Sequence, residues 1–341
     1  MIDREMPRQF MMSAIPHFEG TGRKLESTSE MRSSMVSVIM PSFNNARYID
    51  EAIAGVVGQS WGRLELIIVD DGSTDESPVI IQKWLDRDVR INLVTHEMNR
   101  GVSSALNTGL RNARGHYIGF CASDDIWLPH KIAVELECFA RFPEVGVVHS
   151  DSEIINDSSH RTGELFSAIY QTAMKARAGN LLQDLLVGNY ISAPTVLLRK
   201  DCVQTVGMFP ESIKWLEDWV YMVRVARRFT FYYIPDILVQ YRIHSGSSSA
   251  DRLGYEKSRV RARLILLSEI PEMALSTRLL YYRQIITSCI KLIAKRIWMS
   301  RLLGFALGPS NLVRKTANRV LSVLPAQVVR LFGKFKSSSE R

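Results

Sequence analysis

Between residues 36 and 148, short runs of apolar and β-branched residues alternate with segments whose apolar residues recur at a helical period. This alternation predicts a parallel sheet whose strands are joined by crossover helices. The expected strands cover 36–40, 66–69, 91–94, 117–120 and 145–148, and the expected helices cover 48–59, 77–86, 103–113 and 128–142. Ligands bind such sheets at the carboxyl ends of the strands, so residues that follow the strands are the first functional candidates.

The rest of the chain has a polar stretch, a further strand and a helical C-terminal region. Residues 151–180 are polar and predict a mobile excursion before a helix at 181–187. A strand is expected at 195–198. From about residue 255 to residue 336 the pattern is mainly helical, with breaks at Pro271, Gly308-Pro309 and Pro325.

The N-terminus and the cysteines indicate a cytoplasmic protein. Residues 1–33 lack the continuous apolar core and the cleavage site of a secretory signal, so we expect a disordered tail. Met31 and Met35 lie just before or within the start of the sheet region, and part of the tail could reflect the choice of start codon. The four cysteines have no C-x-x-C spacing, which argues against a zinc ribbon or a disulfide framework.

Charge is distributed unevenly along the chain. The net charge is +8, from 43 Lys and Arg and 35 Asp and Glu. Residues 251–341 hold 18 of the basic and 5 of the acidic residues, so residues 1–250 hold 25 and 30. This distribution argues against a nucleic-acid-binding domain, in which positive charge lies on the recognising surface.

The basic C-terminal region has no uncharged stretch that reaches the roughly 18 residues needed to cross a bilayer. Two interpretations stay open for its helices. They could lie on an anionic membrane surface, because apolar positions alternate with Lys and Arg around Trp298 and Phe305. They could instead form a bundle that packs on the preceding domain.

Two pairs of acidic residues follow expected strands. Asp70 and Asp71 end the strand at 66–69, and their carboxylates could accept hydrogen bonds from a nucleobase imide or a ribose, or cap the next helix. Asp124 and Asp125 follow the strand at 117–120. Adjacent carboxylates are costly without a cation, so this pair indicates Mg²⁺ or Mn²⁺ bridging to a nucleotide diphosphate, with a helix cap as the alternative.

The order and spacing of the motifs resemble those of an inverting family-two glycosyltransferase. The resemblance covers about residues 36 to 245. The matching motifs are VSVIMPSFN at 36–44, QS at 59–60, ELIIVDDGS at 65–73, NRG at 99–101, Asn107, Gly109, GHYI at 115–118 and SDD at 123–125.

This resemblance implies a GT-A fold over residues 34–250, a basic helical region at 251–341, and a nucleotide-sugar donor. Carried over to this sequence, the implied donor-binding residues are Pro41, Ser42, Phe43, Asn44, Asp70, Asp71, Asp124 and Arg242. Among them, Asp71 would contact the base and Asp124 the ribose. Asp125 would bind the metal that neutralises the donor diphosphate.

Two positions depart from the family pattern. Ala122 stands where many relatives have the first acid of a D-x-D motif, and Leu106 stands where many have an arginine. The metal site could therefore be weaker than usual, and the contacts of that arginine are in doubt.

A third cluster, Trp215-Leu216-Glu217-Asp218-Trp219, opens a helix-period segment. It resembles the family's acceptor-side motif, which implies acceptor contacts by Trp215 and Glu217 and makes Asp218 the catalytic base. The alternative is a helix N-terminal acid favoured by the helix dipole. Downstream, Arg242 is implied to pair with donor phosphate and His244 to complete the metal shell.

The sequence therefore predicts an inverting, metal-dependent transferase of a UDP-, dTDP- or GDP-linked sugar. Its acceptor is expected to be a glycan or lipid-linked hydroxyl in cell-surface polysaccharide synthesis, such as O-antigen, capsule or exopolysaccharide. The expected location is cytoplasmic, peripheral on the inner face of the cell membrane. A non-catalytic nucleotide-sugar-binding scaffold is the alternative, and a nucleotidyltransferase is disfavoured because no basic triphosphate-binding loop is found.

Overall fold

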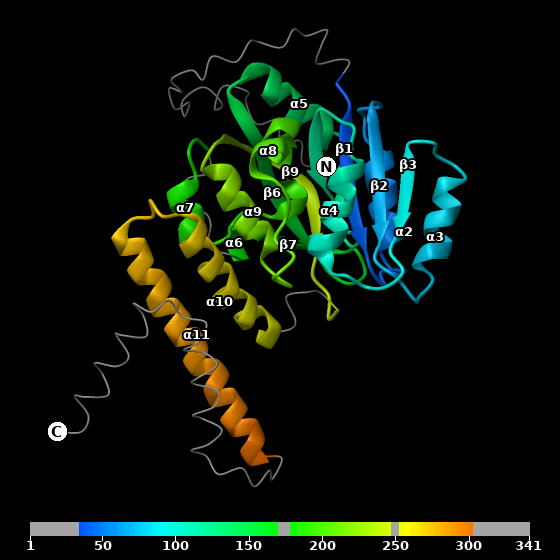
Figure 1. The fold of residues 1–341 in the computed structure, drawn as a ribbon. Coiled ribbons are helices and arrows are strands. Elements are labelled where there is room, and N and C mark those ends of the chain that lie inside the picture. The colour runs from blue at the N-terminus through cyan, green and yellow to red at the C-terminus, as the bar shows by residue number, and fades with distance from the viewer. Residues whose placement is uncertain (1–33, 170–177, 247–251, 303–341) are drawn as a thin grey trace, which may run out of the picture.

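The computed structural model of the protein describes residues 34–169, 178–246 and 252–302 (Figure 1). The expected tail at 1–33 and the expected breaks at Gly308-Pro309 and Pro325 lie outside these residues. The strands described are β1 (Val36–Ser42), β2 (Leu64–Asp70), β3 (Ile91–Thr95), β4 (Tyr117–Phe120), β5 (Ile126–Trp127), β6 (Val145–Ile155), β7 (Arg161–Leu165), β8 (Leu197–Arg199) and β9 (Thr230–Arg242). They form one sheet in the order β3-β2-β1-β4-β8-β6-β9-β5, and β7 pairs with β6.

The sheet is parallel through its first four strands and mixed beyond them. β1 pairs in parallel with β2 and β4, and β2 pairs in parallel with β3. β8 then joins β4 and β6 in antiparallel fashion, whereas β9 runs parallel to β6. Because β1, β2 and β4 are parallel, their carboxyl ends lie at one edge, and both acid pairs follow strands that end there. This arrangement confirms the predicted α/β fold.

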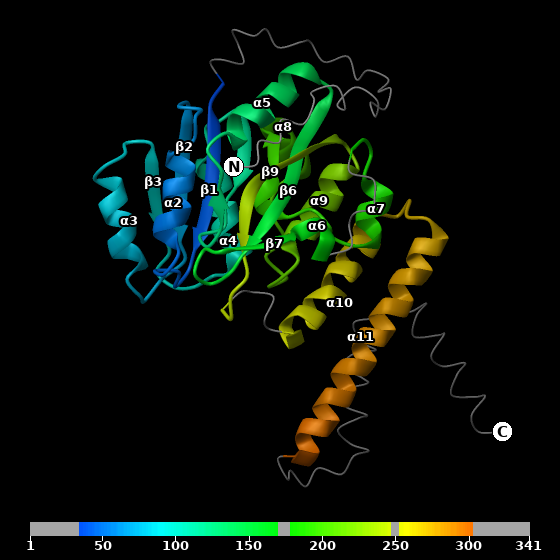
Figure 2. The same ribbon diagram turned by 180° about the vertical axis from the view of Figure 1, so that it is seen from behind.

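Helices cover both faces of the sheet, as Figures 1 and 2 show from opposite sides. Successive residues of β1 and β2 point alternately into two apolar clusters, as the two-residue period of a strand requires. One cluster includes residues of α2, α3 and α5, and the other includes residues of α4, α7, α9 and α10. The helices described are α2 (Ile49–Val57), α3 (Ser77–Leu85), α4 (Val102–Asn112), α5 (Lys131–Arg141), α6 (Phe166–Ile169), α7 (Leu182–Val187), α8 (Lys200–Val206), α9 (Glu217–Ala226), α10 (Arg252–Glu269) and α11 (Leu275–Leu302).

The prediction of a mobile excursion at 151–180 is wrong for residues 151–169. There β6 continues to Ile155 alongside β9, and a turn leads into β7 and α6. Ser150, Asp151 and Ser152 of this strand are buried. Asp151 Oδ1 accepts from the backbone N–H groups of Ser152 (2.9 Å) and Ser167 (3.2 Å). Polar composition therefore misled the prediction, because a polar side chain can be buried when it bonds to the backbone inside the fold.

Besides β7, the strands β5 and β9 were not predicted. β9 contains Pro235 and pairs with β6 through several register shifts, so its sequence lacks a clean two-residue alternation. The expected helix at 128–142 begins only at Lys131, because the Leu128 N–H donates to the Leu238 carbonyl of β9 (3.0 Å). The pairing of β9 with β5 and β6 cannot be predicted from short segments, and it also completes the site described below.

The C-terminal helices pack on the sheet domain through α10 and through Tyr281 of α11, whose ring lies 6.4 Å from the ring of Trp219. Ala262, Leu266 and Ile270 join the apolar cluster that contains α9. Arg224 of α9 adds a 2.6 Å ion pair to Glu269. The break predicted at Pro271 separates α10 from α11, which runs beside α10 and extends away from the sheet (Figures 1 and 2).

For α10 the bundle interpretation is therefore the observed one. Contact with a membrane and a domain boundary at residue 250 stay predictions. In the part of the chain that the structure describes, no helix is both long and apolar enough to cross a membrane.

Gly115 is required where the chain enters β4. A Cβ atom there would lie 2.5 Å from the Ser37 backbone nitrogen and 2.9 Å from the Met35 carbonyl oxygen, so backbone would have to move. We expect Gly115→Ala to lower the free energy of unfolding by about 1–3 kcal/mol, measured by urea denaturation. Gly62→Ala is the matched control, because its Cβ would meet no atom within 4 Å. Equal stability of the two variants would contradict the predicted clash.

Candidate active site

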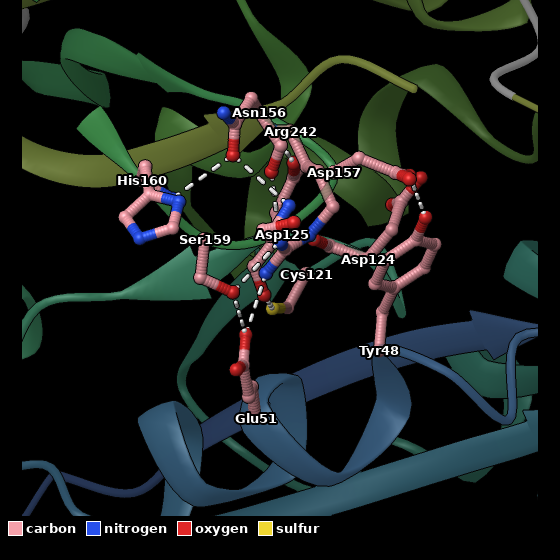
Figure 3. Close-up of polar contacts among 11 residues, drawn as sticks. Tyr48, Glu51, Cys121, Asp124, Asp125, Asn156, Asp157, Ser159, His160 and Arg242 are labelled. Atoms are coloured by element: carbon pink, nitrogen blue, oxygen red, sulfur yellow. Dashed lines mark hydrogen bonds and ion pairs between the residues drawn. The ribbon is translucent and has the colours of Figure 1, made fainter. Parts of the chain in front are cut away.

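The second acid pair, Asp124 and Asp125, lies next to the end of β9. Asp124 and Asp125 lie between β4 and β5, and β5 pairs antiparallel with β9, with Ile126 opposite Gln240. This pairing brings together groups about 120 residues apart in the chain. The Arg242 N–H donates to Asp125 Oδ1 (2.8 Å), and His244 Nε2 lies 3.1 Å from Asp124 Oδ2 (Figure 3 for Arg242).

The two acids of this pair differ in environment. Asp125 is fully buried, and burial together with the charge of Asp124 raises the pKa of its carboxyl well above the usual range. The Asp124 side chain is 22% exposed and faces His244. Both acids line the cavity described below, whereas His244 does not. Asp124 faces His244, and Asp125 Oδ1 accepts from the backbone of β9. A helix cap is excluded as the role of either acid, since α5 begins only at Lys131.

These residues fit a divalent cation that is shared with a substrate. Among the residues described, no group of three or more His, Cys, Asp and Glu side chains is arranged to hold a metal ion. The carboxylate of Asp124 and the imidazole of His244 would supply two ligands. Mg²⁺ commonly takes one or two carboxylates and completes its shell with substrate phosphates and water. A cation here would also stabilise the adjacent carboxylates in their charged forms.

In the first acid pair, Asp71, for which a contact with the base is predicted, is bonded within the protein. The Asp71 carboxylate accepts backbone N–H groups of Arg100 (3.0 Å) and Gly101 (2.7 Å) and bonds His96 Nδ1 (2.6 Å). It thereby fixes the loop before α4. Asp70 Oδ1 and the neighbouring Ser42 Oγ are buried and have no protein partner.

Asp70 and Ser42 stand opposite each other in the β1–β2 register. Buried polar atoms of native proteins are nearly always paired, so these two atoms are candidates for contact with a polar ligand. The acid that bonds backbone at the start of α3 is Asp75, through the Ser77 N–H (3.0 Å), so neither Asp70 nor Asp71 is used as a helix cap.

The loop after β1 is tied to the loop after β2. Asn44 has a φ of 51° and accepts the Thr74 N–H at 2.8 Å through its side-chain oxygen. Its own N–H donates to Ser73 Oγ (2.9 Å). Phe43, next to it, is 43% exposed. An exposed aromatic ring beside the unpaired atoms of Asp70 and Ser42 suits a planar ligand.

A cavity of about 230 Å³ joins the metal-side acids to Glu217 and Asp218. Pro41, Leu106 and Ala122 also line it, so both departures from the family pattern lie in its wall. Trp215 does not line it, and its backbone N–H donates to Ser258 Oγ of α10 (3.3 Å). The acceptor-side role of Trp215 stays a prediction, because Trp215 is not among the residues that line this cavity.

Asp218 is held in a fixed orientation at the start of α9. Its Oδ2 accepts from Asn189 Nδ2 (2.9 Å) and its Oδ1 from the Trp219 N–H (2.7 Å). The preceding Leu216 has a φ of 68°, which turns the chain sharply into the helix. Sequence analysis missed Asn189, because a lone Asn in a loop 29 positions away carries no local signal.

Burial raises the pKa of the Asp218 carboxyl, against its two hydrogen bonds. Burial and the charge of Asp218 also raise the pKa of Glu217 to about 8. A carboxylate with a raised pKa is a stronger base than an exposed one, which suits proton abstraction near neutral pH. At neutral pH Glu217 then carries a proton, so it can donate a hydrogen bond in this cavity.

Because Glu217 holds its proton in the folded protein, the free energy of unfolding should fall as pH rises. Between the usual pKa of a Glu and about 8, the folded protein binds a proton that the unfolded chain releases, so stability falls with pH across this window. Glu217→Gln stays neutral throughout. We expect its Tm to exceed the wild-type value by a few degrees at pH 9 and by less at pH 6. The exposed Glu97→Gln is the control, and a Tm difference that does not grow with pH would contradict the shift.

The chain matches one protein family and is similar to several glycosyltransferases. The model of the family described as Glycosyl transferase family 2 matches residues 37–203. An uncharacterized glycosyltransferase of Rickettsia prowazekii is 28% identical over 64% of this chain and 66% of its own length. TuaG of Bacillus subtilis, a candidate teichuronic acid biosynthesis glycosyltransferase, is 30% identical over 64% of this chain and 82% of its own length.

Two solved structures share the fold. TarS of S. aureus in complex with UDP has a TM-score of 0.55 at 18% identity, over 86% of this chain and 82% of that one. The mannosyltransferase PcManGT of Pyrobaculum calidifontis, in complex with GDP-Man and Mn²⁺, has a TM-score of 0.54 at 17% identity, over 90% of this chain and 81% of that one. At these identities the likeness concerns the fold.

Proposed function

Because the chain belongs to glycosyl transferase family 2, we propose that it transfers a sugar from a nucleotide-sugar donor to an acceptor hydroxyl with inversion at the anomeric carbon. One observation carries this proposal. Asp218, oriented by Asn189 and the Trp219 N–H, lines the same cavity as Asp124. A base at one part of a cavity and a diphosphate-binding acid at another part are the two requirements for a single displacement.

In the proposed reaction, Asp218 accepts the proton of the acceptor hydroxyl as its oxygen attacks the anomeric carbon. The bond between that carbon and the diphosphate oxygen breaks, and the nucleoside diphosphate leaves with the electron pair. Attack opposite the leaving group inverts the configuration at that carbon. The raised pKa of Asp218 supports this role, because the carboxylate gains more from accepting the proton.

We assign the cation to Asp124 and His244 rather than to the predicted Asp125, because Asp124 and His244 face each other at 3.1 Å while Asp125 is buried against β9. When bound there, Mg²⁺ or Mn²⁺ would neutralise charge on the diphosphate and stabilise it as a leaving group. The Mn²⁺ in the complex of PcManGT agrees with a divalent cation in this fold.

For the donor, we assign the base to Asp70, Ser42 and Phe43, because these residues present two unpaired buried polar atoms and an exposed ring. UDP- and GDP-linked sugars are the leading candidates. Such nucleotides are bound in the similar structures. Asp71 fixes the loop at Arg100 and Gly101. We assign it no direct contact with the base.

For the acceptor, we propose a glycan or a lipid-linked glycan of a cell-surface polysaccharide, in keeping with the name of TuaG. The C-terminal helices supply a basic surface that could meet anionic lipid at the inner face of the membrane, although α10 packs on the sheet domain. The non-catalytic scaffold remains the competing function.

The test is nucleotide release from UDP-, GDP- and dTDP-sugars with a cell-envelope lipid extract as acceptor, in Mn²⁺ or in EDTA. Turnover that needs both Mn²⁺ and the extract supports the proposal and identifies the donor, and NMR of the product gives the anomeric configuration. Tight binding of a donor without turnover would instead support the scaffold.

A further inference from the structure

Arg242 is joined to three separate parts of the fold (Figure 3). Its side chain is 0% exposed. Nε donates to the Asp124 carbonyl oxygen (2.7 Å), and Nη2 donates to Glu51 Oε2 of α2 (2.7 Å). Nη1 donates to the Asn156 carbonyl oxygen (3.1 Å) and to Ser159 Oγ (2.9 Å), both in the turn between β6 and β7.

The turn reached by Arg242 is itself fixed. Asn156 Oδ1 accepts the N–H groups of Ser158 (2.9 Å) and His160 (3.1 Å). Ser159, with a φ of 62°, donates its hydroxyl proton to Glu51 Oε2 (2.7 Å). Glu51, Ser159 and Arg242 therefore form a closed triangle of hydrogen bonds. We call these three residues the Arg242 clamp.

Arg242 also supports the opposite side of the Asp124–His244 pair. Its guanidinium carbon lies 4.7 Å from the centre of the Tyr48 ring, and that ring lies 4.7 Å from the ring of His244. The Tyr48 hydroxyl is bonded to Asp157 of the same turn. One buried cation therefore contacts the backbone of Asp124 directly and His244 through Tyr48.

We propose that Arg242 is a positioning residue, and that with Glu51 and Ser159 it holds Asp124 and His244 at the separation that a divalent cation requires. The sequence-based prediction was different, namely a direct contact between Arg242 and the donor phosphates. Arg242 lines the cavity, but its side chain has no exposed area and donates four of its five N–H groups to protein oxygens. One N–H group is therefore left for a diphosphate, too few for the paired contact that Arg usually makes with phosphate. This inference rests on the proposed function, because it presumes a cation at Asp124.

Glu51 allows the two roles to be distinguished. Its side chain is 48% exposed and is not among the residues that line the cavity, so its loss should leave the fold and the substrate contacts intact. If Arg242 positions the metal ligands, removing Glu51 loosens the clamp and weakens cation binding. If Arg242 instead binds the diphosphate, removing Glu51 frees Nη2 and leaves nucleotide binding unchanged or stronger.

The experiment measures Mn²⁺ binding by the EPR signal of free Mn²⁺, with saturating UDP or GDP, for wild type, Glu51→Ala and Ser159→Ala. Glu272→Ala is the matched control, because Glu272 is 52% exposed and pairs with Arg227, the residue that follows α9. We expect both clamp variants to weaken Mn²⁺ binding by about tenfold, the lower end of the loss typical for groups that orient metal ligands. Both should stay folded without metal, with a Tm a few degrees below wild type because each loses a bond to a buried guanidinium. Glu272→Ala should bind Mn²⁺ as wild type does.

Wild-type Mn²⁺ affinity in both clamp variants would overturn the proposal and leave the proposed function untouched. Tighter nucleotide binding by Glu51→Ala would also overturn it, in favour of direct phosphate contact. Failure of the wild-type protein itself to bind Mn²⁺ with any nucleotide would count against the metal site of the proposed function, and so against the premise of the clamp. Arg242→Lys adds a further check, because Lys keeps the charge but reaches fewer of the four acceptors, and it should show a larger Mn²⁺ defect than either clamp variant.

Discussion

Replacing Asp218 by Asn is expected to reduce kcat by about 10³-fold, the middle of the range for loss of a general base. Asn is close to Asp in size and can still accept the Trp219 N–H through its side-chain oxygen, so the fold should survive. It cannot take up a proton from the acceptor hydroxyl. Steady-state kinetics with the identified donor, together with calorimetric binding of that donor, measure the effect.

Donor binding should stay within about twofold of wild type, because Asp218 makes no contact that holds the donor before the reaction. Asn189→Ala is the companion variant. It leaves the carboxylate in place but removes one of its two orienting hydrogen bonds, so kcat should fall by about tenfold. If Asp218→Asn kept more than a tenth of wild-type kcat, the assignment of the base would be wrong, and Glu217 would be the next candidate.

Removing the metal-facing acid should have the second largest effect. Asp124→Ala is expected to lower kcat/KM by about 10²–10³-fold in saturating Mn²⁺, because several kcal/mol of charge stabilisation on the leaving diphosphate are lost. Binding of Mn²⁺ in the presence of nucleoside diphosphate should fall with it. Titration of Mn²⁺ monitored by EPR separates this loss from a general loss of structure.

Asp125→Asn is the control that distinguishes the two acids. The Asn side-chain oxygen can still accept the Arg242 N–H, and burial already raises the pKa of Asp125, so a neutral group at this position costs little. We therefore expect Asp125→Asn to bind Mn²⁺ within about threefold of wild type, less than the weakening expected from loss of a ligand. The opposite ranking, with Asp125→Asn losing Mn²⁺ and Asp124→Ala retaining it, would restore the prediction made from the family pattern.

Much of the first half of the fold could be predicted because its signals are local. The strands β1, β2, β3 and β4 are apolar runs that end within a few residues of the predicted bounds, and the helices between them have a helical period. The residues that end β2 and β4 could be read as site candidates for the same reason. Family resemblance added the roles, which stay predictions until the variants are measured.

Less could be predicted where long-range pairing decides the structure. β6 carries Ser150, Asp151 and Ser152 in a buried strand, and β9 accommodates a proline, so neither matches the simple pattern of its class. Both become strands because they pair with each other and with neighbours. Backbone partners supplied by tertiary contacts outweighed the local preference.

The sequence by itself determined which residue types gather at the carboxyl edge of the sheet, since a parallel strand order and the acids that follow each strand are properties of short segments. Only the tertiary structure decided which of these groups keep free atoms. Asp71 is occupied by the Arg100–Gly101 backbone, Asp125 by the Arg242 N–H, and the Arg242 side chain by Glu51 and the turn at 156–160. Asp70 Oδ1 has no hydrogen-bond partner, and the Asp124 side chain stays 22% exposed. The physical reason is that a hydrogen-bonding group can act on a ligand only when no protein partner has already taken its atoms, and those partners lie 25 to 191 positions away in the chain.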